Sequence, residues 1–60
     1  MENWNDLATR FKQNIRDNGD TIRDFALKHD LRPNTFRSYL SGELPNVPEE
    51  VQKIVREYVK

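Results

Sequence analysis

Apolar residues recur at intervals of three and four along nearly the whole chain, in four short runs separated by glycine or proline. This spacing gathers the apolar side chains on one side of an α-helix, so each run predicts an amphipathic helix. The predicted helices cover residues 3–17, 21–29, 33–41 and 48–59. Since nothing in the chain shows the alternation typical of a strand, the predicted fold is all-α, a compact bundle of four helices.

Each predicted helix has a recognisable start. Three starts resemble a capping box, in which a short polar side chain accepts from the backbone N–H three residues on. These pairs are Asn3 with Asp6, Thr21 with Asp24, and Asn46 with Glu49. Pro33 suits the first position of the third helix, and Pro48 the first turn of the fourth.

Size and composition limit what the chain can be. Sixty residues make one domain, 1–60, near the lower limit of length for folding without disulfides or bound metals. There is no cysteine, so neither a disulfide framework nor a structural zinc site of the cysteine type is expected. The apolar runs are too short to span a membrane, and the beginning of the chain does not resemble a signal peptide. We therefore expect a cytoplasmic protein without a membrane partner.

The charges balance. Ten basic and ten acidic residues give no net charge, whereas DNA-binding domains usually have a basic surplus. By segment, residues 1–19 carry three of each, residues 20–42 carry four basic and three acidic, and residues 43–60 carry three and four. The one-charge surplus lies in the central segment.

The central segment, residues 21–42, predicts two short helices joined by a tight turn. The small residue Ala26 stands where two such helices would cross. Asp30 would occupy the turn, where a left-handed backbone is often needed and Asp is among the tolerated residues. Leu31 is the only apolar residue between two polar stretches, so we expect it to fill the core from the turn.

This segment resembles the helix-turn-helix of the phage repressor and Cro proteins, the lambda-repressor-like or XRE class. The residues that carry the resemblance are Thr21, Phe25, Ala26, Leu31, Phe36, Tyr39, Ser41 and Gly42. One predicted helix precedes the motif and one follows it, as in that class. The resemblance implies a sequence-specific transcriptional regulator that reads the major groove with the helix starting at Pro33. A related interpretation is the DNA-docking helix-turn-helix of transposases, replication proteins and small terminase subunits.

The resemblance also implies which side chains contact DNA. Expected contacts to base edges are Asn34, Arg37 and Ser38. Expected contacts to phosphates are Thr21, Arg23, Arg32, Thr35 and Ser41. Asn can pair with adenine and Arg with guanine through two hydrogen bonds. The alternative is that Asn34 and Thr35 only complete a helix N-terminus and that Arg37 is a solvated charge.

Other polar residues resemble catalytic or metal-binding groups but have simpler explanations. His29 is the only histidine, and no serine, cysteine or metal-binding residue accompanies it at helical spacing. The pairs Asp20/Asp24 and Glu49/Glu50 fall in predicted first turns, where acidic side chains favour the helix dipole. With no glycine-rich phosphate loop either, we expect no enzyme activity, catalytic residue, metal, cofactor or small-molecule substrate.

The expected partner is double-stranded DNA. Apolar residues near the end of the fourth helix also suggest a homodimer through this C-terminal helix, which would bind two half-sites about 34 Å apart. A second hypothesis is a protein-interaction module on the same fold, an antirepressor or an adaptor, that binds a partner through residues 51–58. The zero net charge and Glu43 favour this second hypothesis.

Overall fold

The computed structural model describes residues 3–59 and contains four α-helices. They are α1 (Trp4–Asp17), α2 (Ile22–Lys28), α3 (Pro33–Ser41) and α4 (Glu49–Val59). The all-α prediction is confirmed, and every helix boundary lies within one residue of its predicted place. The predicted domain, 1–60, includes residues 1, 2 and 60, which lie outside the described residues.

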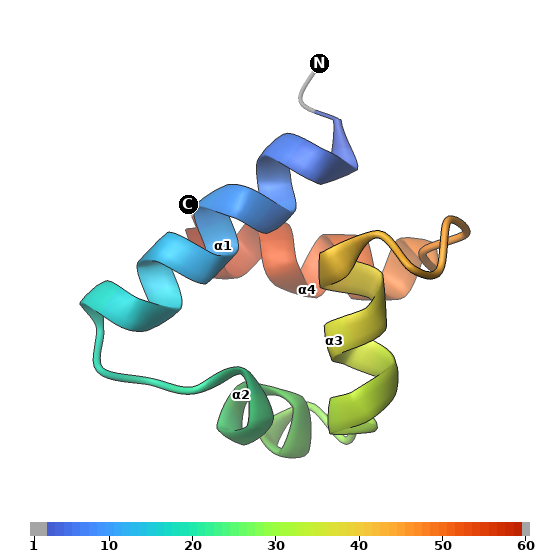
Figure 1. The fold of residues 1–60 in the computed structure, drawn as a ribbon. Coiled ribbons are helices and arrows are strands. Elements are labelled where there is room, and N and C mark those ends of the chain that lie inside the picture. The colour runs from blue at the N-terminus through green and yellow to red at the C-terminus, as the bar shows by residue number, and fades with distance from the viewer. Residues whose placement is uncertain (1–2, 60) are drawn as a thin grey trace.

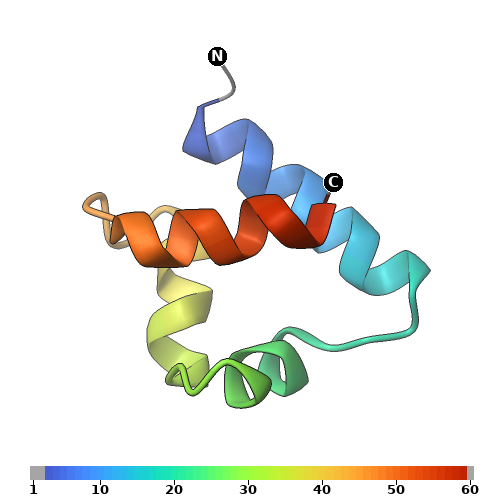
Figure 2. The same ribbon diagram turned by 180° about the vertical axis from the view of Figure 1, so that it is seen from behind.

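The helices are arranged in two pairs. α1 and α4 cross each other and form the most extensive contact, and the short helix α2 lies beside the first turns of α3 (Figures 1 and 2). α3 also contacts α1, which ties the two pairs together. The exposed side of α3 therefore lies at one edge of the molecule.

Two of the three predicted caps are present. Asn3 Oδ1 accepts a hydrogen bond from Asp6 N at 2.9 Å, and Thr21 Oγ1 accepts from Asp24 N at 3.0 Å. The cap predicted at Asn46 is wrong, because α4 begins only at Glu49.

The proline at position 48 explains the later start of α4. Proline disfavours helical backbone at the residue before it, so Val47 stays outside the helix. Gln52 N donates to Pro48 O at 3.1 Å, and Gln52 Nε2 to Val47 O at 3.0 Å. The two bonds fix the entry to α4.

The first three helices end in the same way. Each is followed by a residue with a left-handed backbone, which is Gly19 (φ 74°), Asp30 (φ 59°) or Gly42 (φ 88°). The N–H of the next residue then donates to a helix carbonyl five positions back. These bonds join Asp20 to Ile15 at 2.9 Å, Leu31 to Ala26 at 2.7 Å and Glu43 to Ser38 at 3.0 Å. The left-handed conformation predicted for Asp30 is confirmed.

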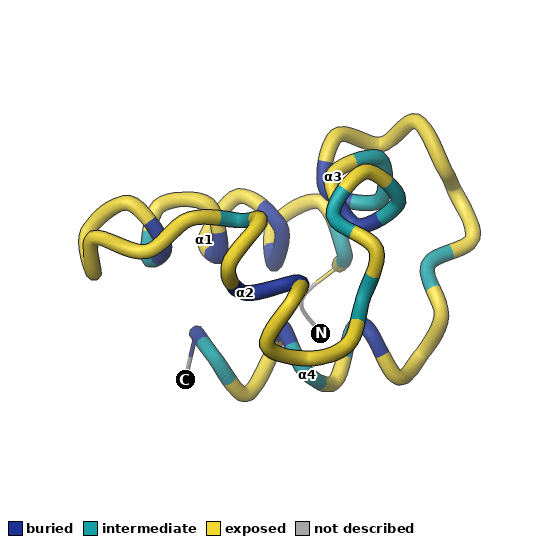
Figure 3. The backbone as a smooth tube through the Cα atoms, turned by 90° about the horizontal axis from the view of Figure 1, so that it is seen from below, coloured by how far each residue is buried: buried dark blue, intermediate teal, exposed yellow. Residues whose placement is uncertain are grey.

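Aromatic rings fill the centre of the molecule. The ring of Phe11 lies 4.7 Å from that of Phe25, 5.6 Å from that of Phe36 and 5.2 Å from that of Tyr58, in edge-to-face arrangements. Such pairs contribute about 0.5–1.5 kcal/mol beyond the burial of their area. Buried residues recur along one side of α1, as its helical spacing predicts (Figure 3).

The residues predicted to hold the central segment are in place. Ala26 is fully buried on α2, and Leu31 is half-buried and packs against the core from the turn. Trp4 is also half-buried, and its indole N–H donates to Tyr39 O at 2.9 Å. This bond joins the start of α1 to the last turn of α3 and so fixes where α3 lies.

Candidate nucleic-acid interface

Four of the eight predicted contact residues share one face of α3. A three- or four-residue step returns to the same side of a helix. The residues on this face are Asn34, Arg37, Ser38 and Ser41. The opposite face carries Phe36 and Leu40, which are both buried. We call the polar side, with these four residues, the open face of α3.

Arg23 of α2 joins two of these residues. With Pro33, Asn34 and Arg37 it lines a surface depression of about 350 Å³ between α2 and α3. Two of the four lining residues are arginines and none is acidic. The structure therefore brings together one predicted phosphate contact and two predicted base contacts in a cationic environment.

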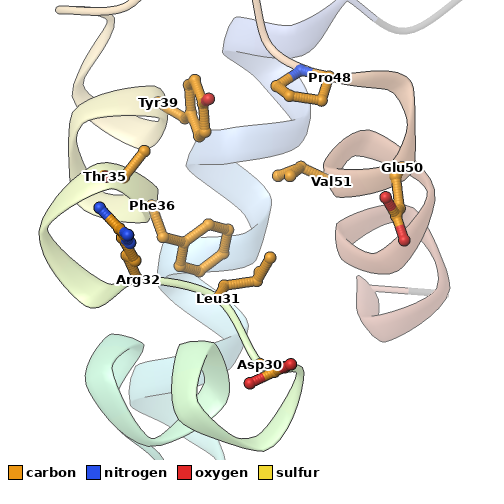
Figure 4. A pocket seen from close by; sticks show the side chains of 9 residues that line it. All are labelled: Asp30, Leu31, Arg32, Thr35, Phe36, Tyr39, Pro48, Glu50 and Val51. Carbon is orange, nitrogen blue, oxygen red and sulfur yellow. The ribbon is translucent and has the colours of Figure 1, made fainter.

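Arg32 and Thr35 lie elsewhere. They line a second depression, of about 260 Å³, between α3 and the beginning of α4 (Figure 4). Leu31, Phe36 and Val51 give it an apolar lining, and Asp30 and Glu50 lie beside it. Because these carboxylates are close, this depression is less favourable to a phosphate than the one at Arg23.

Ser38 is engaged within the protein. It is half-buried, and its hydroxyl lies 3.1 Å from Asn34 O and 3.4 Å from Glu43 Oε2, donating to these acceptors. Since a hydroxyl has a single hydrogen, only its acceptor lone pairs remain for a base edge.

Thr21 and Ser41 also make local hydrogen bonds. Thr21 caps α2, which uses its oxygen as an acceptor and leaves its hydroxyl hydrogen for another group. Ser41 Oγ donates to Ser38 O at 3.1 Å. Both residues are exposed, so they are accessible to a ligand.

Sequence reasoning assigned no DNA contact to Glu43, which the structure places against the open face. A signal for this position was present in the sequence. A glycine that ends a helix in the left-handed conformation turns the next residue back toward the last turn. Here Gly42 is that glycine, and the backbone N–H of Glu43 donates to Ser38 O.

Asp20 has a role other than the one predicted. It lies before α2, not in a first turn, and its Oδ2 accepts from the Tyr58 hydroxyl at 2.9 Å. Asn18 Nδ2 donates to the same hydroxyl at 3.0 Å. Partial burial raises the pKa of Tyr58 above its ordinary value of 10.0; the bond from Asn18 lowers it and Asp20 raises it further.

The remaining acidic residues of the two pairs, Asp24, Glu49 and Glu50, do lie in first turns. His29 caps the end of α2, exposed to solvent, with its ring 4.4 Å from the ring of Phe25.

None of the described residues forms a group of three His, Cys, Asp or Glu that could hold a metal ion. No helix within residues 3–59 has the length and apolarity to cross a membrane.

Most apolar residues of α4 are used inside the chain. Val51, Val55 and Val59 are buried in the core, and Ile54 and Tyr58 are half-buried. The apolar surface expected over residues 51–58 is therefore small. What remains is a depression of about 230 Å³, lined by Phe25, His29, Ile54, Glu57 and Tyr58.

Comparison of the chain with protein-family models, with curated proteins and with solved structures gave no match. The residues and their geometry are thus the basis for assigning a function.

Proposed function

We propose that this chain is a sequence-specific DNA-binding protein, a transcriptional regulator of the phage repressor and Cro type. In this proposal α2 and α3 act as a helix-turn-helix, and α3 enters the major groove. The observation that carries it is the meeting of Arg23, Asn34 and Arg37 around one depression without a carboxylate in its lining. Arginine and asparagine are the residues that pair with guanine and adenine in the major groove.

The arrangement of the open face supports different roles for these residues. Asn34 lies at the beginning of α3, the part of a recognition helix that meets base edges, and Arg37 follows one turn later at its middle. In this proposal Arg23, which lies on α2, contacts a phosphate beside the groove. Phosphate contacts position the protein, and base contacts select the sequence.

Arg32, Thr35, Thr21 and Ser41 remain predicted phosphate contacts. Arg32 is exposed just before α3, and Thr35 is half-buried at the edge of the second depression. Their separation from Arg23 means that they would reach a different stretch of DNA backbone. Since the protein has no net charge, we expect modest affinity from one copy.

The dimensions of the chain favour the use of two copies. Its Cα trace extends at most 26 Å, less than the roughly 34 Å that separates two half-sites one helical turn apart. The proposal therefore includes a homodimer through α4, where half-buried Ile54 lies on the surface beside Glu57 and Tyr58. Such a regulator would act in the cytoplasm, where the DNA of a bacterial cell lies.

A titration of the 60-residue protein against duplexes selected from a random pool tests the proposal. We expect one preferred sequence at low salt, and Arg37→Ala should weaken binding to it about tenfold through loss of a base contact. Arg16→Ala, a matched change at an exposed position of α1, should have little effect. The slope of affinity against salt then counts the phosphates contacted.

Two results would contradict this function: no preference among sequences at low salt, or equal binding by the Arg37→Ala variant. A duplex with two half-sites tests the dimer in the same titration. Binding that is no steeper than on one half-site would argue against two cooperating copies.

One observation favours the second candidate, a protein-interaction module. Leu27 on α2 is 56% exposed and Leu44 in the loop before α4 is 40% exposed. Exposed leucines together with zero net charge suit a protein partner better than DNA. If DNA binding fails, loss of a partner on Leu27→Ala would support this candidate.

A further inference from the structure

Glu43 is held at two points against the open face of α3. Its backbone N–H donates to Ser38 O at 3.0 Å, as part of the turn at Gly42. Its Oε2 accepts from Ser38 Oγ at 3.4 Å. Ser38 lies one helical turn after Asn34, so the carboxylate belongs to the same surface as the predicted base contacts.

A carboxylate at this place restricts what the surface can bind. It only accepts hydrogen bonds, and its charge repels the phosphate groups of DNA. In the major groove, however, the bases also present amino groups. Glutamate accepts from the N4 amino group of cytosine, whereas guanine offers only acceptors at this edge and adenine presents the N7 acceptor, which repels a carboxylate, beside its N6 amino group.

We propose that Glu43 is a specificity-determining residue of the DNA interface, which accepts a hydrogen bond from the N4 amino group of a cytosine in the site. This inference rests on the proposed function, because it assumes that the open face lies in the major groove. Glu43 then selects for cytosine and selects against the bases and phosphates that offer it no donor.

The hydrogen bonds of Ser38 suit this role. Its single hydrogen has two acceptors within reach, Asn34 O at 3.1 Å and Glu43 Oε2 at 3.4 Å. When the carboxylate turns to a base, the hydroxyl keeps its bond to Asn34 O, and no polar group of Ser38 loses its partner. Glu43 is also exposed, so contact with a base requires no rearrangement of the core.

The carboxylate of Glu43 also offsets the positive charge of the arginines near the open face. Arg23 and Arg37 attract any DNA, regardless of sequence, whereas a carboxylate on the same face weakens every contact that lacks an amino group. The lower total affinity is thereby accompanied by a larger ratio between specific and non-specific binding.

The variant Glu43→Gln tests the inference, because glutamine has the same shape without the charge and can also donate hydrogen bonds. The intact 60-residue protein is titrated with its selected duplex and with versions that carry each of the four base pairs at every position. We expect the wild type to prefer cytosine at one position by about tenfold. In Glu43→Gln this preference should disappear, and a random duplex should bind more tightly.

Glu49→Gln is the matched control, since it makes the same change of charge at an exposed residue of α4 that lines none of the depressions described above. It should keep the cytosine preference and the weak binding of the random duplex. Circular dichroism of both variants checks that the four helices are retained.

The outcomes separate this inference from the function on which it rests. If the wild type binds selectively and depends on Arg37, but Glu43→Gln keeps every base preference, Glu43 does not read a base and only the present inference is overturned. The same holds if Glu49→Gln and Glu43→Gln behave alike. If the wild type prefers no sequence at low salt, the proposed function is overturned together with it.

Discussion

The two corners on either side of α2 have the same backbone geometry but different means of support. At the corner between α1 and α2, Gly19 takes the left-handed conformation, and side chains of Asn18 and Asp20 are bonded to the Tyr58 hydroxyl. At the corner between α2 and α3, Asp30 takes that conformation, and Leu31 packs into the core.

The difference shows how a small domain can fix one helix at both ends. The first corner relies on an unstrained glycine and a polar contact across 38 residues of sequence. The second relies on apolar burial and a backbone bond of 2.7 Å from Leu31 N to Ala26 O, with a residue that is less suited to the turn. Because the second corner sets the direction of α3, its packing matters for the proposed interface.

The largest expected effect is at the second corner. Leu31→Ala removes the apolar side chain that packs from the turn and should lower the free energy of unfolding by about 2 kcal/mol. This value is at the low end of the range for leucine in a core, because Leu31 is only half-buried. Urea denaturation followed by far-UV circular dichroism measures it.

Leu27→Ala provides the control, since it is the same substitution at a leucine that is 56% exposed. It should change the free energy of unfolding by less than about 0.5 kcal/mol. Equal losses in the two variants would show that Leu31 does not support the corner through burial.

A smaller effect is expected at the first corner. Tyr58→Phe keeps the ring against Phe11 and Phe25 but removes the hydroxyl that joins Asn18 and Asp20. The residues concerned are at the surface, so we expect a loss of about 1 kcal/mol in the free energy of unfolding. Tyr39→Phe is the matched control.

The effect of Tyr58→Phe on the free energy of unfolding depends on pH. The pKa of Tyr58 is raised above 10.0 in the folded protein, so folding favours the neutral phenol. Its contribution is fully present below pH 10.0 and is lost as the pH rises through the folded pKa. The stability difference between the wild type and Tyr58→Phe should therefore shrink in alkaline solution. A difference that grows above pH 10 would show that the sign is wrong.

Much of the fold could be predicted because the local signals agree with the packing. The spacing of Leu7, Phe11 and Ile15 gave the buried side of α1, and Gly19 and Gly42 gave its end and that of α3. The cap at Asn46 was predicted wrongly, since a local pattern for capping competes there with the restriction that Pro48 imposes on Val47. The bonds of Tyr58 to Asn18 and Asp20 depend on tertiary structure, which no local pattern contains.

The candidate site was predictable to a smaller extent. Helical spacing correctly placed Asn34 and Ser38 on one face, but it could not show that Arg23 of α2 would join them and that Arg32 would lie elsewhere. That division depends on how α2 and α3 pack. Which of these residues contact DNA stays a prediction, because many different side chains at an exposed position are compatible with the same fold.

The smallest expected effect compares the two corners directly. Asp30→Gly removes the Cβ that makes a left-handed backbone unfavourable, by about 1–2 kcal/mol for ordinary residues, but glycine loses more entropy on folding, by about 0.5–1 kcal/mol. The net expectation is a gain of about 0.5 kcal/mol in the free energy of unfolding. Asp30→Asn separates the backbone from the charge, since it removes an acidic group near the end of α2 and keeps the Cβ.

Gly19→Ala makes the reverse change where a Cβ would meet nothing within 4 Å, so its cost of about 1 kcal/mol comes from the backbone alone. Thermal and urea denaturation should place Asp30→Gly above Asp30→Asn. Equal values for those two variants would mean that charge, and not backbone conformation, distinguishes the second corner from the first.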